Sequence, residues 1–404
     1  DGMLVQQTTR YTHMLKKHEE QFNASGSVLL ISAPGRTEIG GNHTDHNNGV
    51  VIAAAVNLDI IAVVAKNDEN VVRVISHGFG KIDDVNLRDL TPQPVEAEHS
   101  ASLIRGVAAG IVKDGGKVGG FDCYTTSNVL RGSGLSSSAA FEVCIGAILR
   151  GEYNNNDMEK FNQVKIAQIG QFAENVFFGK PCGLMDQTAC AVGGVITIDF
   201  KDPAHPVVGQ TAIDLAKHGF VMCISDTKGS HADLTDEYAA IPAECRAVAA
   251  VCGGEVLRDV PFETFIANLP ACRKQCGDRA VLRAFHIYAD NQRVARQVNA
   301  LRAGDFETFL QLVNESGTSS WEYLQNVIPA GYKEHQEVGV TIAAAKHLLG
   351  DKGAVRVHGG GFAGTVQAFV PVEMLDEFKA GMEAILGEGR CHVLSIRPEG
   401  GAVL

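Results

Sequence analysis

The stretch that decides the fold of this chain is Leu130-Arg131-Gly132-Ser133-Gly134-Leu135-Ser136-Ser137-Ser138-Ala139-Ala140. Its glycines let backbone N–H groups converge, because no Cβ stands in the way. The apolar segment 141–149 that follows is typical of a helix, and a helix start presents unpaired N–H donors and the positive end of the helix dipole. The stretch therefore predicts a phosphate-binding loop. The alternative interpretation is a serine-rich N-cap after a turn.

Two further glycine-rich polar segments lie far from this one in the sequence. Segment 34–49 follows a strand that we expect to end at Pro34 and Gly35, and segment 358–365 lies between two predicted strands. Each glycine costs conformational entropy on folding, so one active-site cleft lined by all three segments explains them most simply. The chain has no Walker P-loop sequence and no complete dinucleotide-binding glycine motif before residue 132.

Composition places the chain among ordinary globular proteins. Its 404 residues suffice for two domains, and 45% of them are hydrophobic and 20% charged. A net charge of −12 without a Lys/Arg block argues against nucleic acid or an anionic membrane as the main partner. The ten cysteines include no CxxC pair, which favours free thiols in a reducing cytoplasm. We recognise no signal peptide, and the apolar run 49–65 is interrupted by Asn57 and Asp59, as in buried strands.

Strands and helices alternate along the chain without repeats. Periodicity predicts helices over 3–22, 103–112, 139–151, 157–178, 238–251, 278–301, 305–316, 338–349 and 373–386. It predicts strands over 28–35, 50–65, 71–75, 121–127, 194–199, 219–225 and 391–396, with a strand–turn–strand unit over 355–370 and a turn over 182–187. This order indicates an α+β fold of two domains, 1–200 and 201–404.

The three glycine-rich segments match, in order, the motifs of a known superfamily. They read Pro34-Gly35-Arg36 with Gly41-Asn42-His43-Thr44-Asp45, then Gly134-Leu135-Ser136-Ser137-Ser138-Ala139, then Gly359-Gly360-Gly361-Phe362-Ala363-Gly364. In these segments the chain resembles the GHMP small-molecule kinases and, within them, the galactokinase family, from about residue 30 to its end. The resemblance implies a two-domain GHMP kinase fold with the active site between the domains. It also implies ATP-dependent phosphorylation of the anomeric hydroxyl of galactose.

The resemblance implies roles for residues on the phosphoryl side. Asp186 would accept the proton of the sugar hydroxyl, and Arg36 would keep that carboxylate ionised and stabilise charge on the phosphoryl group. A surface ion pair is the alternative. Ser138 and Glu174 would hold Mg²⁺, although Glu174 is alternatively a solvated helix carboxylate and Ser136 and Ser137 are alternatively helix caps. The residues expected to bind ATP are Gly132, Ser133, Gly134, Leu135, Ser136, Ser137 and Ser138.

On the sugar side, the resemblance implies contacts from His43, Asp45, Gly183 and Tyr238 to ring hydroxyls. Asp45 can accept two hydrogen bonds from neighbouring hydroxyls, which would distinguish epimers. His43 is alternatively a core histidine, and Tyr238 alternatively packs without binding. A metal site at His43, Asp45 and His46 is disfavoured, because these ligands crowd on one loop without a cysteine.

The chain departs from the galactokinase pattern in its sugar loop. The familiar loop reads Gly-Arg-Val-Asn-Leu-Ile-Gly-Glu-His-Thr-Asp-Tyr, and Asn42 stands here where that loop has the Glu that receives the sugar 6-hydroxyl. An amide still bonds a hydroxyl, so galactose remains the expected substrate. Galacturonic acid is the alternative substrate, because Asn42 would tolerate its C6 carboxylate, which a Glu at this position would repel. Glu38 is a candidate to restore the missing charge.

Segment 98–103 also lacks the aromatic residues that usually border the adenine in this family. A non-catalytic sugar sensor and a kinase for mevalonate or homoserine are the other readings of the chain. The intact serine loop, together with Arg36, Glu174 and Asp186, favours an enzyme. We expect a monomer whose partners are the sugar and ATP.

Overall fold

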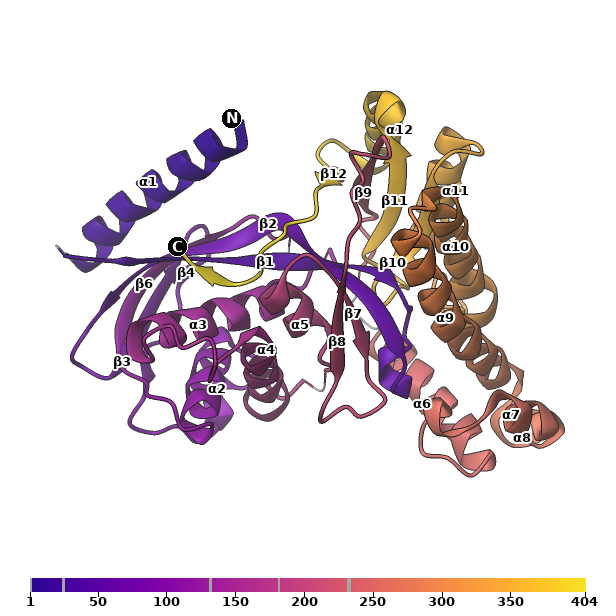
Figure 1. Ribbon diagram of the computed structural model, residues 1–404, viewed down its shortest axis with the longest axis horizontal. Coiled ribbons are helices and arrows are strands. Elements are labelled where there is room, and N and C mark those ends of the chain that lie inside the picture. Colours follow the sequence, from indigo (N-terminus) through magenta and orange to yellow (C-terminus); the bar gives the residue numbers. More distant parts are fainter. Residues whose placement is uncertain (1, 24–25, 131–132, 181, 231–233) are drawn as a thin grey trace.

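The computed structural model describes residues 2–23, 26–130, 133–180, 182–230 and 234–404, and its strands lie in two sheets (Figure 1). The larger sheet has nine strands among these residues, and its main path runs β13-β1-β2-β6-β3-β4. The strands are β1 (Leu29–Gly40), β2 (Val50–Lys66), β3 (Val71–Ser76), β4 (Gly80–Lys81), β5 (Val85–Asn86), β6 (Phe121–Ser127), β7 (Val195–Asp199), β8 (Val207–Thr211) and β13 (Ala402–Val403).

Helices cover both faces of the larger sheet. Helix α1 (Gly2–Phe22) lies on one face, and α2 (Ser100–Lys113), α3 (Ser137–Tyr153), α4 (Gln163–Phe172) and α5 (Met185–Val192) lie on the other (Figure 1). Side chains of β2 alternate between the two layers, as the pleat of a strand requires. Ile61 and Val63 pack with Met14 of α1, whereas Ala62 and Val64 belong to the main core beneath.

The smaller sheet is antiparallel and runs in the order β10-β11-β9-β12. These strands are β9 (Phe220–Asp226), β10 (Ala354–His358), β11 (Thr365–Pro371) and β12 (Cys391–Leu394). Helices α11 (Glu337–Leu349) and α12 (Leu375–Leu386) share one core with it. On the other side, Phe309 of α10 (Phe306–Ser319) packs edge-on against Phe369 of β11, with ring centroids 5.6 Å apart.

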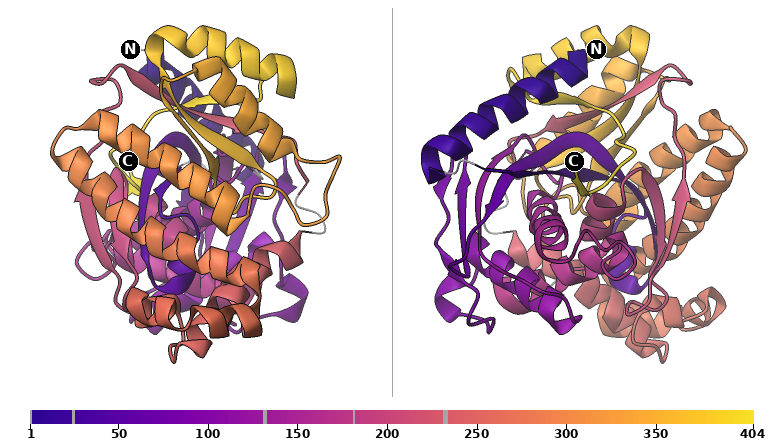
Figure 2. Two further views of the ribbon diagram at one scale, coloured as in Figure 1. Left: turned by 90° about the vertical axis from the view of Figure 1, so that its right-hand side faces the viewer. Right: turned by 60° about the vertical axis from the view of Figure 1, so that its left-hand side comes forward.

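Helix α9 (Asp278–Arg302) packs beside α10, as Figure 2 shows from the side. It shares a separate hydrophobic core with α6 (Thr235–Val251) and α8 (Leu269–Cys276), next to α7 (Phe262–Ala267). Shorter turns complete the chain: η1 (Asp45–Asn47), η2 (Pro94–Glu96), η3 (Ala173–Phe178), η4 (Leu257–Asp259), η5 (Ser320–Leu324) and η6 (Val372–Met374). No described helix combines the length and the apolar character that crossing a lipid bilayer requires.

The sequence predictions place most of these elements, and the main error concerns β1. The strand does not end at Pro34 and Gly35 but continues to Gly40, with breaks in its register against β2 between Pro34 and Arg36 and between Glu38 and Gly40. Proline lacks an N–H, so a strand accommodates it at such an irregularity. Residues 36–40, which we expected in a polar loop, therefore lie in a buried strand, and the loop begins only at Gly41.

Three smaller corrections apply elsewhere. The helix predicted over 157–178 begins only at Gln163 and continues as the π-helical turn η3 from Ala173. Asp186 lies in the first turn of α5, whereas we expected a turn over 182–187. Strand β8 and helices α7 and α8 were not predicted, because short or weakly periodic segments carry little signal.

The C-terminal segment returns to the larger sheet. Strand β13 pairs with β1 through Ile31 and Val403, and Gly401 N donates to Cys190 O of α5 at 3.0 Å. The segment thus supports the helix that carries Asp186. A division of the chain near residue 200 remains a prediction.

We predict that Gly400→Ala destabilises the protein by about 1–3 kcal/mol, the usual cost of overpacking. An added Cβ would overlap the carbonyl of Ala191 in α5, where backbone cannot move aside cheaply. Thermal unfolding should show a lower midpoint than for the control Gly26→Ala, whose Cβ would meet nothing within 4 Å. Equal midpoints for the two variants would contradict this account of the C-terminal packing.

Candidate active site

The three glycine-rich segments meet in the folded chain. Arg36 N of β1 donates to Leu135 O of the predicted phosphate loop at 3.0 Å. Thr365 Oγ1, at the start of β11, donates to Ser133 O at 2.6 Å. His43, just after β1, donates from Nε2 to the carbonyl of Gly360 at 3.0 Å. Residues more than two hundred positions apart thus build one polar region.

At its centre lies the ion pair between Arg36 and Asp186. Arg36 Nε donates to Asp186 Oδ1 at 2.9 Å, and the same guanidinium donates to the carbonyl of Gly134. Ser136 Oγ donates to Asp186 Oδ2 at 2.6 Å. The arginine side chain is only 7% exposed and the aspartate 37%. This is therefore not a surface ion pair, yet the carboxylate stays open to a ligand.

These contacts set the charge of Asp186. Burial raises the pKa of its carboxyl, but Arg36 and the hydrogen bonds from Arg36 and Ser136 outweigh burial and lower the pKa below its ordinary value. Asp186 is consequently ionised at neutral pH. An ionised carboxylate with lone pairs to spare can accept a proton from a hydroxyl.

The predicted phosphate loop leads directly into α3. Gly134 has φ +71° and Ser136 φ +58°, so the chain turns sharply before the helix begins at Ser137. The Ser136 hydroxyl makes no cap bond with α3, because Asp186 accepts it. Ser133 Oγ donates to Leu130 O at 2.7 Å and stabilises the turn itself. Gly132 lies outside the described residues, whereas Leu135 is buried and Ser137 and Ser138 are half-buried at the helix start.

His358, which the sequence analysis did not single out, connects the segments from the inside. The N–H of Glu38 donates to its Nε2 at 3.3 Å, so the ring proton sits on Nδ1 and donates to Thr365 Oγ1 at 2.9 Å. Burial, followed by the charge of Arg36, holds the pKa of His358 well below its usual value, which keeps the ring neutral. A histidine directly before the Gly359–Gly361 run was the available signal.

The sugar loop presents a second neutral histidine. Because His43 Nε2 donates to Gly360, its Nδ1 is an acceptor, and this buried atom has no partner among the described residues. Burial and then the neighbouring His46 lower the pKa of His43 to about 4. His43 is thus not simply a satisfied core residue, since it keeps one acceptor free for a ligand.

The other predicted sugar residues lie close to this loop. A Cβ on Gly183 would stand 3.0 Å from Asp45 Oδ2, so glycine leaves the space beside that carboxylate open. Tyr238 of α6 donates its hydroxyl to Gly361 O at 2.8 Å, and its ring packs edge-on against Phe362. Tyr238 therefore combines packing with a polar contact to the glycine turn.

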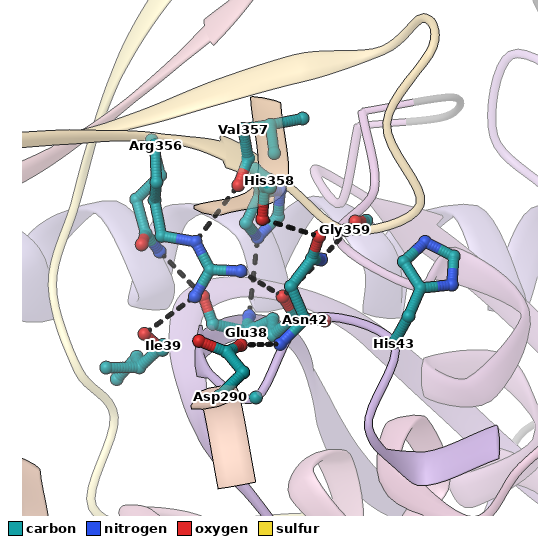
Figure 3. Close-up of polar contacts among 12 residues, drawn as sticks. Glu38, Ile39, Asn42, His43, Asp290, Arg356, Val357, His358 and Gly359 are labelled. Carbon is teal, nitrogen blue, oxygen red and sulfur yellow. Dashed lines mark hydrogen bonds and ion pairs between the residues drawn. The ribbon is translucent and has the colours of Figure 1, made fainter. Parts of the chain in front are cut away.

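Asn42 is fully buried, and its side chain is surrounded by polar protein groups (Figure 3). Its Nδ2 donates to Glu38 Oε1 at 3.0 Å and to Gly359 O at 2.7 Å. Its Oδ1 accepts from Ser320 Oγ at 3.1 Å and from Asn326 Nδ2 at 2.8 Å. An amide has two donor hydrogens and two acceptor lone pairs, so a bond to the sugar 6-hydroxyl would require one of these contacts to be given up.

Carboxylates behind the phosphate loop offer oxygen ligands. Glu174 on η3 is buried, which does not fit a solvated helix residue, and Gln187 Nε2 donates to its Oε2 at 2.8 Å. Oε1 of the adjacent buried Glu142 has no hydrogen-bond partner in the described structure. The described part of the chain contains no cluster of three or more His, Cys, Asp or Glu side chains arranged to hold a metal. A hard cation here would draw further ligands from phosphate oxygens and water.

Comparison with known proteins places this fold in the GHMP kinase class. Residues 102–194 match the family model of the GHMP kinase N-terminal domain. The fold resembles mevalonate kinase of Methanococcus jannaschii, with a TM-score of 0.64 and 13% identity over 92% of this chain and 99% of that one. It resembles more strongly Lactococcus lactis galactokinase complexed with galactose, with a TM-score of 0.82 and 22% identity over 98% and 100% of the two chains.

Comparison of the amino-acid sequence identifies the family within this class. Residues 16–66 match the model of the galactokinase galactose-binding signature. The chain is 34% identical to the galactokinase of Actinobacillus pleuropneumoniae over 358 residues, which cover 87% of this chain and 88% of that protein. The chain belongs to the galactokinase family.

We predict that His43 stays neutral until the pH falls to about 4. The unfolded chain binds this proton near pH 6.5, so the contribution of His43 to stability is constant above that pH and falls as the pH drops from 6.5 towards 4. A side-chain NMR titration, with His43→Gln to assign the signal, should give a midpoint near 4. A midpoint at the ordinary histidine value would contradict the burial argument.

Proposed function

We propose that this chain transfers the γ-phosphoryl group of ATP to the anomeric hydroxyl of galactose, giving galactose 1-phosphate and ADP. The observation that carries the proposal is the half-exposed Asp186 carboxylate, held ionised between Arg36 and Ser136. It lies beside the contacts of Arg36, from the segment that matches the galactose-binding signature, with Gly134 and Leu135 of the predicted phosphate loop. Membership of the galactokinase family supports the choice of sugar.

In the proposed mechanism, Asp186 acts as general base. Each of its oxygens already accepts one hydrogen bond, from Arg36 or Ser136, and keeps a further lone pair for the O1 hydroxyl. As the bond from O1 to the γ-phosphorus forms and the bond from that phosphorus to the ADP oxygen breaks, the hydroxyl proton passes to the carboxylate. Arg36 then balances charge that spreads over the transferring group.

The remaining sugar hydroxyls meet neutral and anionic acceptors. His43 would accept a hydrogen bond from a sugar hydroxyl at Nδ1, and Asp45 would accept two such hydrogen bonds, with Gly183 leaving the room they need. Tyr238 would close the pocket from α6. A direct bond from Asn42 to the 6-hydroxyl stays a prediction that its four protein contacts do not favour.

The start of α3 would receive the ATP phosphates, because its first N–H groups have no intrahelical partner. Gly132, Ser133, Gly134 and Leu135 would contribute the loop before it, and Ser136 and Ser137 the turn itself. Ser138 and Glu174 would hold Mg²⁺, and the buried unpartnered oxygen of Glu142 beside them fits a cation-binding neighbourhood. When bound, the ion supplies positive charge that offsets the phosphates.

We also propose that the protein works as a cytoplasmic monomer with its two domains meeting near residue 200. The ten cysteines are all free, as expected of a reducing compartment. Size-exclusion chromatography with light scattering tests the monomer directly.

The proposed activity is tested by ADP release with ATP and Mg²⁺ against galactose, galacturonic acid, N-acetylgalactosamine, glucose and arabinose. We expect turnover to be fastest with galactose and the product to be the 1-phosphate, identified by phosphorus NMR. Fastest turnover with galacturonic acid would move the assignment to that sugar. Galactose binding without any turnover would indicate a sensor.

Replacing the proposed base separates chemistry from folding. We predict that Asp186→Asn lowers kcat at least about a thousandfold, within the range that general bases contribute. The amide oxygen can still accept from Arg36, but the buried guanidinium loses its counter-charge. The thermal unfolding midpoint should therefore fall, while circular dichroism at the assay temperature should still show a folded protein. Asp83→Asn, a change of the same size at an exposed position, should keep full activity. Near-normal turnover in Asp186→Asn would remove Asp186 from the mechanism without removing the kinase assignment.

A further inference from the structure

Asn42 belongs to a buried polar cluster that includes the charged groups of Glu38, Arg356 and Asp290, and Asp290 accepts the backbone N–H of Asn42 at 2.7 Å. Arg356 donates to Ile39 O at 2.8 Å, to Val357 O at 3.0 Å and to the Glu38 carboxylate. A fully buried guanidinium needs such a counter-charge. The same Glu38 oxygen accepts from the Asn42 amide, as Figure 3 shows. A carboxylate at position 42 would instead place a second negative charge against Glu38.

This contact explains the unusual order of residues in the loop. The familiar galactokinase loop has Asn at the position of Glu38 and Glu at the position of Asn42, so acid and amide are exchanged here. In this chain the amide of residue 42 donates to the acid of residue 38 at 3.0 Å. With the residues exchanged, an amide at position 38 would donate to an acid at position 42, so the contact is kept and its direction is reversed. The acid of this chain faces Arg356, and the amide faces the glycine turn.

Three successive carbonyls of the glycine turn each accept a hydrogen bond from a side chain. Asn42 donates to Gly359 O, and His43 Nε2 donates to Gly360 O at 3.0 Å. Tyr238 donates to Gly361 O. The hydrogen bond from Asn42 thus fixes the turn at Gly359, and the next residue, Gly360, accepts the hydrogen bond that orients His43. That orientation leaves His43 Nδ1 as the free acceptor.

We propose that Asn42 is a positioning residue of the sugar site. Its amide fastens the sugar loop to Glu38 and Gly359, and it acts on the sugar through His43 and not through a bond to the 6-hydroxyl. The proposal rests on galactose being the substrate. It follows that residue 42 does not read the C6 substituent in this chain.

A comparison of two sugars tests this directly. The dissociation constants of galactose and 6-deoxygalactose are measured by calorimetry for the wild type and Asn42→Asp. We expect both sugars to lose about tenfold in affinity, because the loop loses two hydrogen bonds and gains a like charge. The ratio of the two constants should stay within about twofold of the wild type. Loss for galactose alone would mean that Asn42 bonds the 6-hydroxyl and would overturn the proposal.

Asn70→Asp serves as the control, since it adds the same charge at an exposed turn. Its affinities should match the wild type. The KM for ATP should stay unchanged in Asn42→Asp while the KM for galactose rises. A general loss of structure would change both KM values. If Asn42→Asp does not fold, Asn42→Ser replaces it in the same comparison without adding a charge.

A second arm uses the neighbouring acid. In Glu38→Gln/Asn42→Asp the acid–amide contact re-forms with its direction reversed, while the bond to Gly359 stays lost. Glu38→Gln also takes the carboxylate away from Arg356, so the comparison is made only if the double variant unfolds no earlier than Asn42→Asp. We expect the double variant to bind galactose about threefold or more tighter than Asn42→Asp alone. A double variant that binds galactose no more tightly than Asn42→Asp would overturn the proposed role of the Glu38 contact. If 6-deoxygalactose binds too weakly to be measured, this comparison of galactose affinities tests the proposal instead. A wild type that binds neither sugar would refute the proposed function instead.

Discussion

The buried guanidinium of Arg36 is the group on which the arrangement of the site depends. A cation taken out of water is tolerated only where a carboxylate and carbonyl oxygens surround it. Asp186 of α5 supplies the carboxylate and Gly134 of the phosphate loop supplies a carbonyl. Strand β1, the phosphate loop and α5 must therefore converge on one residue. The same contacts lower the pKa of Asp186, so the requirement of folding also keeps the proposed base ionised.

The C-terminal half completes this site and does not merely cover it. His358 accepts from the backbone of Glu38 and donates to Thr365, which in turn bonds Ser133 of the phosphate loop. These buried contacts join β1, β10 and β11 to the loop before α3. A neutral imidazole suits this place because it offers one donor and one acceptor on opposite sides. Displacing β10 or β11 would therefore disturb the phosphate loop, whereas the hydrogen bonds of Asn42 and His43 to this hairpin go only to the turn between the two strands.

Local patterns in the sequence predicted the parts of the fold that local physics determines. Strand β6 was placed at its observed limits, 121–127, because alternation and flanking turns mark it clearly. The continuation of β1 past Pro34 was missed, because the pairing with β2 tolerates a break in register that no local signal announces. The environment of Asn42 was also hidden. Its amide suggested a hydroxyl ligand, but Ser320 and Asn326, which occupy its oxygen, come from almost three hundred residues away.

Charge pairing within the site also bears on the proposed cation. Arg36 is matched by Asp186, Arg356 by Glu38, and Arg293 by Asp290, whose carboxylate also accepts the N–H of Asn42. These pairs are neutral before any ligand arrives, in a chain of net charge −12. Among the described residues, the positive groups available to the phosphates of ATP are then Arg36, the N-terminal end of the α3 dipole and the exposed Lys180, whose Nζ lies 3.8 Å from Glu174 Oε1. A divalent ion held by Ser138 and Glu174, as proposed, would add further positive charge at this place.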